Sequence, residues 1–281
     1  MGARRAPLLQ AREVVGDLPR RRHVPPRAAR AAHRHLTSLT ALTVASFNTH
    51  WGIGYGARVA ERFDVAATVR SFDADVVILA EAWRPHASES ALDELAADGY
   101  QVEELRFATM RHSPRPAVTH STPGDGWWEL AVLSRFPLRN RRELPIGRVH
   151  KDPVGPRHAL GLTLDVAGTD VELIAVHTSS KLWYGAPVVH LAGLRRHLPA
   201  LDVPAIVAGD CNLWGPGVVA MLPGWRRAVR GRTFTAHLRH SQIDHVLVSR
   251  AVTPLGGEVM PATLSDHRPI RARLQIQSPG G

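Results

Sequence analysis

The chain has 281 residues, of which 44% are hydrophobic, and a formal net charge of +10 at pH 7. This length allows a large buried core, and this apolar content argues against wholesale disorder. No run approaches the roughly 18 consecutive apolar residues of a membrane-spanning helix, and the Arg-rich N-terminus lacks the apolar core of a secretory signal. Cys211 is the only cysteine, which excludes an intramolecular disulfide and a cysteine-based zinc site. We therefore expect a cytoplasmic protein, and we expect it to be a monomer.

The positive charge is concentrated at the N-terminus. Residues 1–40 hold nine arginines against Glu13 and Asp17, so the remaining 241 residues carry only about +3. This segment has little apolar periodicity, and we expect a flexible tail at 1–40, a folded domain at 41–276 and a flexible C-terminus at 277–281. Basicity by itself is weak evidence for a nucleic-acid partner, because so little of it lies in the folded domain.

From Ala41 onward, short runs rich in Val, Ile and Leu alternate with helical stretches, which is typical of an α/β layer protein. The expected strands are 43–48, 76–80, 129–134, 159–166, 171–177, 205–209, 243–248, 257–260 and 270–275. The expected helices are 57–70, 88–97 and 187–198. Residues 160–166 and 171–176 predict a hairpin around a turn at 167–170, whereas 106–126 and 145–156 are rich in Pro, Gly and His and predict loops. Antiparallel pairs and crossover helices both occur, so a purely parallel sheet is not expected.

Several expected strands end at, or begin beside, a residue that can bind a metal or transfer a proton. These residues are Asn48, Glu81, His177, Asp210, Asn212, Asp244, Asp266 and His267. In layered α/β proteins, strand ends that are distant in sequence converge at one edge of a sheet. We therefore expect these side chains to form one site.

The residue types suit the hydrolysis of a phosphodiester, which requires charge neutralisation and an activated water. Carboxylate and amide oxygens are preferred ligands of a hard cation such as Mg²⁺, which suits Asn48, Glu81 and Asp266. A histidine can accept a proton from water near neutral pH when a carboxylate fixes its tautomer, and His267 with Asp244 would form such a pair.

Asp210 and Asn212 are two residues apart on an extended segment, so both face one side. Cys211 faces the other side, and we expect it to be a packing residue and not a nucleophile.

Six segments resemble, in order, the motifs of the endonuclease/exonuclease/phosphatase superfamily. They are SFNTH at 46–50, ILAE at 78–81, VH at 176–177, GDCN at 209–212, IDHV at 243–246 and SDHRP at 265–269. The resemblance covers about residues 42–275. It implies a four-layered α/β sandwich, in which two packed mixed sheets are flanked by helices, and a catalytic role for the domain at 41–276.

The resemblance also implies a role for each matching residue. Asn48 and Glu81 would lie at a Mg²⁺ or Mn²⁺ ion, and Asp266 would support the metal or the phosphate. Asp210 and Asn212 would position the phosphate and the attacking water.

Asp244 would orient His267, the residue that activates water, and His177 would contact the phosphate or assist the leaving group. Members of the family divide acid and base work between the two histidines in different ways, so that division stays open.

The chain departs from the family pattern at Ala80 and at Cys211, which replaces a more usual aromatic or small residue. Ala80 precedes the metal-binding glutamate, where family members more often have Gln. Members that resemble DNase I pair the first histidine with a carboxylate on the mid-chain strand, and Glu129 is the nearest candidate for that partner.

Three further residues are candidates for substrate contacts, namely Arg157, Trp183 and Trp214. Four tryptophans follow motif residues closely: Trp51, Trp83, Trp183 and Trp214. If the motifs converge, these indoles should surround the cleft and stack on bases or rest against lipid. The alternative is that they pack beneath the loops.

The sequence thus predicts a metal-dependent phosphodiester hydrolase that resembles a nuclease, with a phosphoester substrate and nucleic acid as one option. A phosphomonoesterase or a phospholipase of the sphingomyelinase type is the first alternative, because the folded domain is nearly neutral and a duplex-DNA enzyme is usually more basic. A non-catalytic binding module is the second alternative.

Overall fold

The computed structural model describes residues 39–55, 61–110, 125–152, 154–180, 185–238 and 240–277. All of these residues belong to one compact unit. Most of the expected N-terminal and C-terminal tails lie outside them, so these boundaries stay predictions. Within the described residues, no helix is long and apolar enough to cross a membrane.

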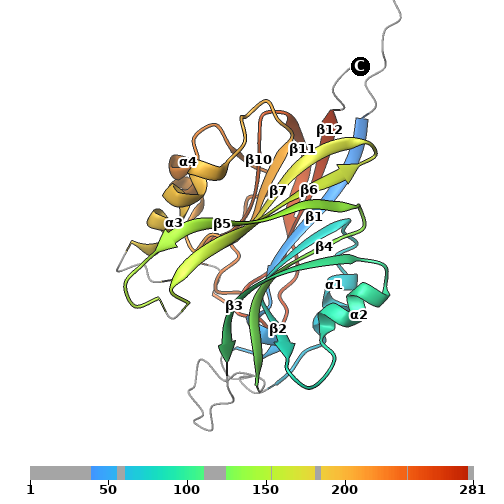
Figure 1. Cartoon of the computed structure of the whole chain (residues 1–281), viewed down its shortest axis with the longest axis vertical. Helices are drawn as coiled ribbons and strands as arrows, with labels where there is room; N and C mark the ends of the chain where they lie inside the picture. Colours follow the sequence, from blue (N-terminus) through green and yellow to red (C-terminus); the bar gives the residue numbers. More distant parts are fainter. Residues whose placement is uncertain are drawn as a thin grey trace, which may run out of the picture. The chain divides into compact units, whose positions relative to one another are not determined.

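The first of two sheets has six strands, in the order β11-β12-β1-β2-β4-β3 (Figure 1). Its strands are β1 (Leu39–Asn48), β2 (Val76–Pro85), β3 (Gln101–Met110), β4 (Gly126–Ser134), β11 (Val252–Val259) and β12 (Ile270–Gln277). β1 and β2 run parallel, and the other neighbouring strands run antiparallel.

The second sheet also has six strands, in the order β5-β6-β7-β8-β10-β9. They are β5 (Leu138–Arg148), β6 (Pro156–Val166), β7 (Thr169–His177), β8 (Ala205–Asp210), β9 (Arg226–Arg227) and β10 (Asp244–Val248). Here β7 and β8 are the parallel pair. Each sheet therefore contains one parallel pair within an otherwise antiparallel arrangement.

Parallel neighbours require a crossover connection, and each parallel pair has one that contains a helix. The connection from β1 to β2 contains α1 (Val65–Arg70), and that from β7 to β8 contains α3 (Ala186–Leu194). The remaining helices are α2 (Ala91–Ala97), α4 (Gly215–Met221) and the short 3-10 turns η1 (His50–Gly52) and η4 (Arg195–His197). In Figure 1, α1 and α2 lie on one side of the two sheets, and α3 and α4 lie on the other.

Alternating side chains give the four layers. Along β2, Ile78 and Ala80 pack between the two sheets, whereas Val77 and Leu79 pack against α1 and α2. Such period-two alternation is what a strand buried on both faces requires. A third apolar cluster joins the second sheet to α3 and α4. The predicted four-layered α/β sandwich of two mixed sheets is confirmed.

The hairpin between β6 and β7 is also confirmed, although its turn is shorter than expected. Asp165 pairs with Asp170, and only Ala167 and Gly168 remain in the turn, with φ values of 52° and 83°. Positive φ at both turn residues matches the right-handed twist of the flanking strands.

Several elements differ from expectation, and β9 and α4 were not expected at all. β3 and β5 occupy parts of the expected loops at 106–126 and 145–156, and both are edge strands, with many exposed charged residues on β5. Edge strands bury only part of their surface, so their apolar pattern is weak. The helix expected at 57–70 begins only at Val65, where the Asp64 side chain accepts a hydrogen bond from the Ala67 N–H.

Candidate active site

Three predicted residues lie side by side on neighbouring strands of the second sheet. His177 at the end of β7 is paired in register with Asp210 at the end of β8, and Asp210 is paired with Asp244 at the start of β10. Because β7 and β8 are parallel and β10 is antiparallel to β8, the three residues share one edge of the sheet. The topology therefore produces the convergence that the sequence predicted.

Gly209 allows the two parallel strands to approach each other at this edge. Its φ is 141°, and a Cβ atom at this position would lie 1.9 Å from the Val176 carbonyl oxygen. A side chain would push β8 away from β7 next to Asp210. The glycine of the GDCN motif thus serves the geometry of the site.

Asn48 connects the first sheet to this edge of the second. It ends β1, and its Nδ2 donates a hydrogen bond of 3.0 Å to Asp210 Oδ2. The His50 N–H donates to Asn48 Oδ1 at 3.0 Å. The amide is therefore held at both ends, with its oxygen oriented by the following turn.

Glu81 leaves the ladder of the first sheet at a β-bulge. The register between β2 and β4 shifts between Leu79 and Ala82, and Glu81 has a φ of 53°, which is rare for a residue other than glycine. The Thr49 hydroxyl donates to the Glu81 carbonyl at 2.6 Å. Glu81 Oε1 lies 3.7 Å from His177 Nε2, so the bulge places this carboxylate beside the second sheet.

His267 and Asp244 form the predicted pair. His267 Nδ1 donates to Asp244 Oδ2 at 2.8 Å. The opposite nitrogen, Nε2, lies 3.8 Å from Asp210 Oδ2 and 4.0 Å from Asp266 Oδ1. Burial favours the neutral imidazole, but the charges of Asp244 and Asp210, followed by that of Asp266, raise the pKa of His267 well above its usual range.

Ser265 holds the loop that carries this histidine. Its hydroxyl donates to the Asn48 carbonyl at 2.8 Å and accepts from the His267 N–H at 3.1 Å. Ser265 lies within the SDHRP motif, but no feature of that motif indicates a separate role for it. Its function becomes visible only because the end of β1 lies beside this loop.

His177 has very different surroundings. Its ring lies against the rings of Phe107 and Trp128, at centroid distances of 5.8 and 5.7 Å. Burial, followed by the positive charge of Arg157, lowers the pKa of His177 well below its usual range. Its Nε2 is 3.9 Å from Asp210 Oδ2, which is beyond hydrogen-bond distance. These surroundings favour the neutral imidazole of His177, and aromatic packing holds its ring.

Glu129 is not the partner of His177. Trp128 and Leu130 are buried on the side of β4 that faces the second sheet, whereas Glu129 accepts a hydrogen bond of 3.0 Å from Arg106 Nε. Adjacent residues of a strand face opposite sides, so Trp128 occupies the place that the resemblance suggested for a carboxylate. The alternation of residues along the strand could have shown that Trp128 and Glu129 face opposite sides. Phe107 could not be recognised in this way, because it lies in a segment expected to be a loop.

Arg157 lies in the wall of the cleft behind His177. Its Nε and one terminal nitrogen donate to the two carboxylate oxygens of Asp152, at 2.9 and 3.1 Å. Its guanidinium lies 5.1 Å from the ring centroids of both Phe107 and Trp128. Both members of this ion pair are buried. Arg157 therefore forms a rigid backing for His177, with much of its donor capacity taken by Asp152.

Asn212 is fixed by three features of its loop. Its N–H donates to Asp210 Oδ1 at 2.8 Å, its Nδ2 donates to the Thr178 carbonyl at 2.9 Å, and its φ is 47°. Asparagine tolerates this left-handed conformation better than most residues. Cys211, between Asp210 and Asn212, is completely buried against α3 and α4, as expected for a packing residue.

The predicted residues line one cleft of about 330 Å³. Its lining includes Asn48, Glu81, Arg157, His177, Asp210, Asn212, Asp266 and His267, together with His50, Trp51, Tyr55, Trp128, Thr178, Ser180 and Phe234. Asp244 lies behind His267. The structure thus brings together all eight residues expected to act in catalysis or metal binding.

The cleft is strongly acidic. Burial, followed by the charges of Asp266 and Asp210, raises the pKa of Glu81 to about 8. Burial, followed by the charge of Asp244, raises the pKa of Asp210 to about 7. Carboxylates gathered in this way repel one another, and a cation bound between them would relieve that repulsion.

The oxygen atoms of Asn48, Glu81 and Asp266 suit a hard divalent cation, so the residues present fit the predicted metal. Asp210, Asp244 and His267 also present one ligand atom each, all within 4.8 Å of one another. However, Asp244 Oδ2 is already bonded to His267 Nδ1, which fits an acid–base pair better than a metal ligand set.

The expected ring of tryptophans is only partly formed around this cleft. Trp51 lines it and is buried, and Trp214, just beyond Asn212, is 57% exposed. Trp183 lies outside the described residues. Trp83 instead lines a second cavity, of about 380 Å³, between β2 and the segments that precede α1 and α2.

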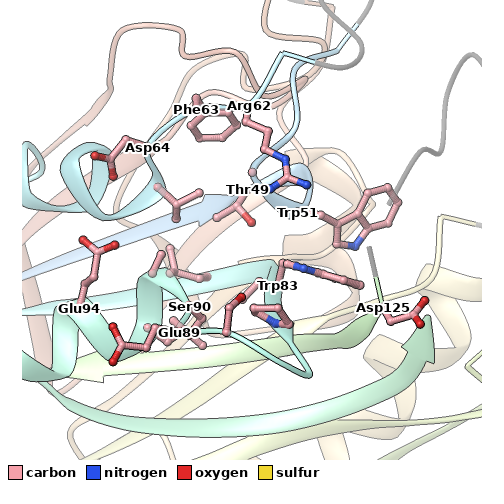
Figure 2. Close-up of a pocket in the computed structure, with 18 residues that line it drawn as sticks. Thr49, Trp51, Arg62, Phe63, Asp64, Trp83, Glu89, Ser90, Glu94 and Asp125 are labelled. Atoms are coloured by element: carbon pink, nitrogen blue, oxygen red, sulfur yellow. The ribbon is translucent and has the colours of Figure 1, made fainter. Parts of the chain in front are cut away.

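Figure 2 shows this second cavity, with the indole of Trp51 on the side of Arg62 and the indole of Trp83 below it. Trp51 lines both cavities and therefore separates them. Two polar groups at the second cavity have structural roles, since Asp64 caps α1 and Ser90 belongs to the capping box of α2. Trp51 and Trp83 thus fit the alternative, in which the indoles pack beneath the loops, better than the expectation that they form an exposed rim.

The sequence profile of the Endonuclease/Exonuclease/phosphatase family matches residues 45–267. The chain belongs to this family. Members of the family are phosphoester hydrolases and generally use divalent metals. Among curated proteins, no sequence matches this chain significantly.

Solved structures share the fold. An endonuclease/exonuclease/phosphatase from Beutenbergia cavernae DSM 12333 is 24% identical, covers 84% of this chain and 72% of its own, and has a TM-score of 0.67. The mannosyl-6-phosphatase of Bacteroides thetaiotaomicron VPI-5482 is 16% identical over 83% of this chain and 99% of its own, with a TM-score of 0.56. The human Nocturnin catalytic domain, solved with a bound sulfate anion, is 13% identical over 85% and 97%, with a TM-score of 0.59.

Proposed function

We propose that this protein is a divalent-metal-dependent phosphodiester hydrolase with Mg²⁺ or Mn²⁺ as its cofactor. One observation carries the proposal: hard oxygen ligands converge in a single cleft with a hydrogen-bonded carboxylate–histidine pair. An acidic site with a water-activating pair suits attack on an anionic phosphoester, provided that a cation neutralises the charge.

Asn48, Glu81 and Asp266 would hold the cation, which supplies charge neutralisation of the phosphate and a more acidic water. His267 accepts the proton of the attacking water at Nε2, while Asp244 fixes the position of the ring through Nδ1. Asp266 is one of the carboxylates that raise the pKa of His267 and would also hold the cation, so a bound cation would lower that pKa.

The remaining residues hold the substrate. Asp210 and Asn212, locked to each other by the bond from the Asn212 N–H, position the phosphate and the water. His177, which is held against two aromatic rings, donates from Nε2 to a phosphate oxygen or to the leaving oxygen. No covalent enzyme intermediate is needed, since water is the nucleophile.

Hydrolysis of model substrates tests the proposal. Wild-type protein should hydrolyse bis(p-nitrophenyl) phosphate with Mg²⁺ or Mn²⁺, and excess EDTA should abolish the reaction reversibly. Glu81→Ala and His267→Ala should each lower kcat/KM on the order of 10³-fold or more with the fold intact, because they remove a metal ligand and the base. Retained activity in both variants would refute the mechanism.

Two matched variants control for the loss of a charge or a ring. Glu143→Ala removes an exposed carboxylate on β5, and His158→Ala removes a histidine on β6 that does not line the cleft. Both should hydrolyse the diester at the wild-type rate. A panel of p-nitrophenyl phosphate, sphingomyelin, RNA, and single- and double-stranded DNA then separates phosphodiesterase action from phosphomonoesterase or phospholipase action. A preference for the monoester or the lipid would replace the proposed substrate class.

A further inference from the structure

A groove of about 650 Å³ lies outside the catalytic cleft, beside β9 and α4. It is lined by the arginines Arg226, Arg227 and Arg230 and by apolar residues that include Pro216, Val219 and Pro254. None of its lining residues is acidic. The groove thus concentrates positive charge on an apolar base.

The three arginines of the groove, and Arg232 next to them, have no carboxylate partner in the described part of the chain. Neither Arg227, Arg230 nor Arg232 takes part in an ion pair there. By contrast, Arg70, Arg139 and Arg271 are each paired with a carboxylate. An arginine cluster without counter-charges is the electrostatic footprint of an anionic ligand.

The charge of Arg227 is held in place by neighbouring groups. One terminal nitrogen donates to Gln242 Oε1 at 3.2 Å, and the guanidinium lies so close to Gly215 that a Cβ there would meet it at 1.6 Å. Burial, followed by the charge of Arg230, lowers the pKa of Arg227. A bound anion would relieve this like-charge repulsion.

Two chain segments connect the groove to the catalytic cleft. In one, Asn212 lines the cleft and Pro216 lines the groove, with the exposed Trp214 between them. In the other, Phe234 lines the cleft and Arg230 lines the groove. Arg232, which is exposed, lies between these two residues.

The separation of the two sites can be estimated from the strand that they share. β9 is paired with β10 through Arg227 and Leu247, three residues from Asp244. At the strand rise, these three residues place Arg227 about 10 Å from Asp244 as measured along β10. A strand with bases stacked as in a duplex rises ~3.4 Å per nucleotide, so about three stacked nucleotides would span this distance along β10.

We propose that this groove binds the phosphate backbone of a single-stranded nucleic acid whose scissile phosphate occupies the catalytic cleft. The guanidinium groups contact phosphates distant from the cleft, and Trp214 stacks on a base between the two sites. The proposal deepens the phosphodiesterase function and rests on it, since it names the class of diester that is hydrolysed.

Equilibrium binding tests the proposal without relying on catalysis. Full-length protein is titrated, in EDTA, against a fluorescein-labelled oligothymidylate of about twelve nucleotides, and Kd is measured by anisotropy across a series of NaCl concentrations. Arg230→Ala/Arg232→Ala should raise Kd by about tenfold at low salt. The slope of log Kd against log[NaCl] should fall by roughly 1.4, because two single-strand phosphate contacts are lost.

Three further variants give the test its specificity. Arg195→Ala/Arg196→Ala removes two exposed arginines from η4 and should leave both Kd and the salt slope at their wild-type values. Trp214→Ala should raise Kd by roughly tenfold with an unchanged salt slope, and Trp214→Phe should restore binding, because the contribution of a stacked ring is not ionic.

The outcomes separate the alternatives. The proposal is overturned if the Arg230/Arg232 variant binds the oligonucleotide like wild type, or if the η4 variant loses as much affinity. It is also overturned if phosphatidylserine vesicles, and not the oligonucleotide, bind through Arg230 and Arg232. Failure of the phosphodiesterase function would show separately, as absence of bis(p-nitrophenyl) phosphate hydrolysis by wild-type protein with metal.

Discussion

His267 and His177 face the same cleft, but they are held in place by different forces. His267 is bonded to a buried carboxylate and lies near two more, so its pKa rises well above the usual range. His177 lies between Phe107 and Trp128 with Arg157 behind them, so its pKa falls well below that range. Neighbouring carboxylates therefore favour the protonated form of His267, whereas burial and the charge of Arg157 favour the neutral form of His177.

The difference follows from where the strands place the neighbours of each histidine. Asp244 begins β10, which is adjacent to the strand that ends in Asp210, so two carboxylates reach His267 from one sheet. The neighbour of His177 across the sandwich is Trp128 of β4, which faces inward because Glu129 faces outward. Whether Trp128 or Glu129 faces inward thus decides whether this histidine has an aromatic or a charged partner.

The largest expected effect comes from the charged partner of His267. Asp244→Asn should lower kcat on the order of 10²- to 10⁴-fold, because an amide can donate to Nδ1 and hold the ring in the wrong tautomer. Steady-state hydrolysis of bis(p-nitrophenyl) phosphate, together with circular dichroism to verify folding, measures this.

Asp170→Asn makes the same chemical change at the exposed β6–β7 turn, where Asp170 is paired with Arg139. It should leave kcat unchanged. If Asp244→Asn keeps more than a tenth of wild-type kcat, the contrast between the two histidines does not have the catalytic meaning assigned to it.

The next effect concerns the backing of His177 and is measured as stability. Asp152→Asn leaves the buried Arg157 guanidinium without its counter-charge, and this should lower the free energy of unfolding by about 3–5 kcal/mol. Urea denaturation of the variant against wild type measures the change.

Asp165→Asn is the matched control, because Asp165 is paired with Arg139 at the surface, with side chains 33% and 49% exposed. Ion pairs of this kind contribute roughly 0–1 kcal/mol. Equal losses of unfolding free energy in the two variants would mean that the buried Arg157–Asp152 pair stabilises the fold no more than a surface ion pair does.

The smallest effect tests the aromatic contact directly. Trp128→Leu should lower kcat about tenfold, corresponding to ~1.4 kcal/mol, because the His177 ring gains freedom to rotate. Trp128→Phe should restore most of kcat, since a ring at this position still limits that freedom.

Trp127→Leu changes the adjacent residue, whose ring contacts His86 and Arg106 instead of His177. It should leave kcat near the wild-type value. A loss of kcat in Trp127→Leu equal to that in Trp128→Leu would point to general damage to β4, and not to positioning of His177.

Much of the fold could be predicted because most strands are buried on both faces. Their continuous apolar runs, such as Val76–Ala80 within β2, carry a strong signal that needs no partner to be recognised. The edge strands β3 and β5 could not be predicted in the same way. Their exposed faces carry charged side chains, and only pairing with β4 and β6 makes them strands.

The candidate site shows the same division. The catalytic and metal-binding candidates lie beside the predicted strands in family order, so their convergence was predictable. The sequence did not identify separate roles in the site for Ser265, Phe107 and Asp152. Ser265 and Phe107 each contact a motif residue far away in the sequence, and Asp152 holds Arg157, which supports another. Residues of this kind have no local sequence pattern, because nothing in the sequence distinguishes them from other small polar, aromatic or acidic residues.

By itself, the sequence determined the family, the alternation of strands and helices, and the chemical types gathered at the site, because periodicity and motif order are local properties. Only the tertiary structure decided which face each side chain presents and which neighbour it meets. That is why Glu129 faces away from His177, why Arg157 is bound to Asp152, and why Arg227 and Arg230 form a groove beside the cleft. Partners across a sandwich are set by strand register and by the approach of the two sheets, and neither is encoded within a single segment.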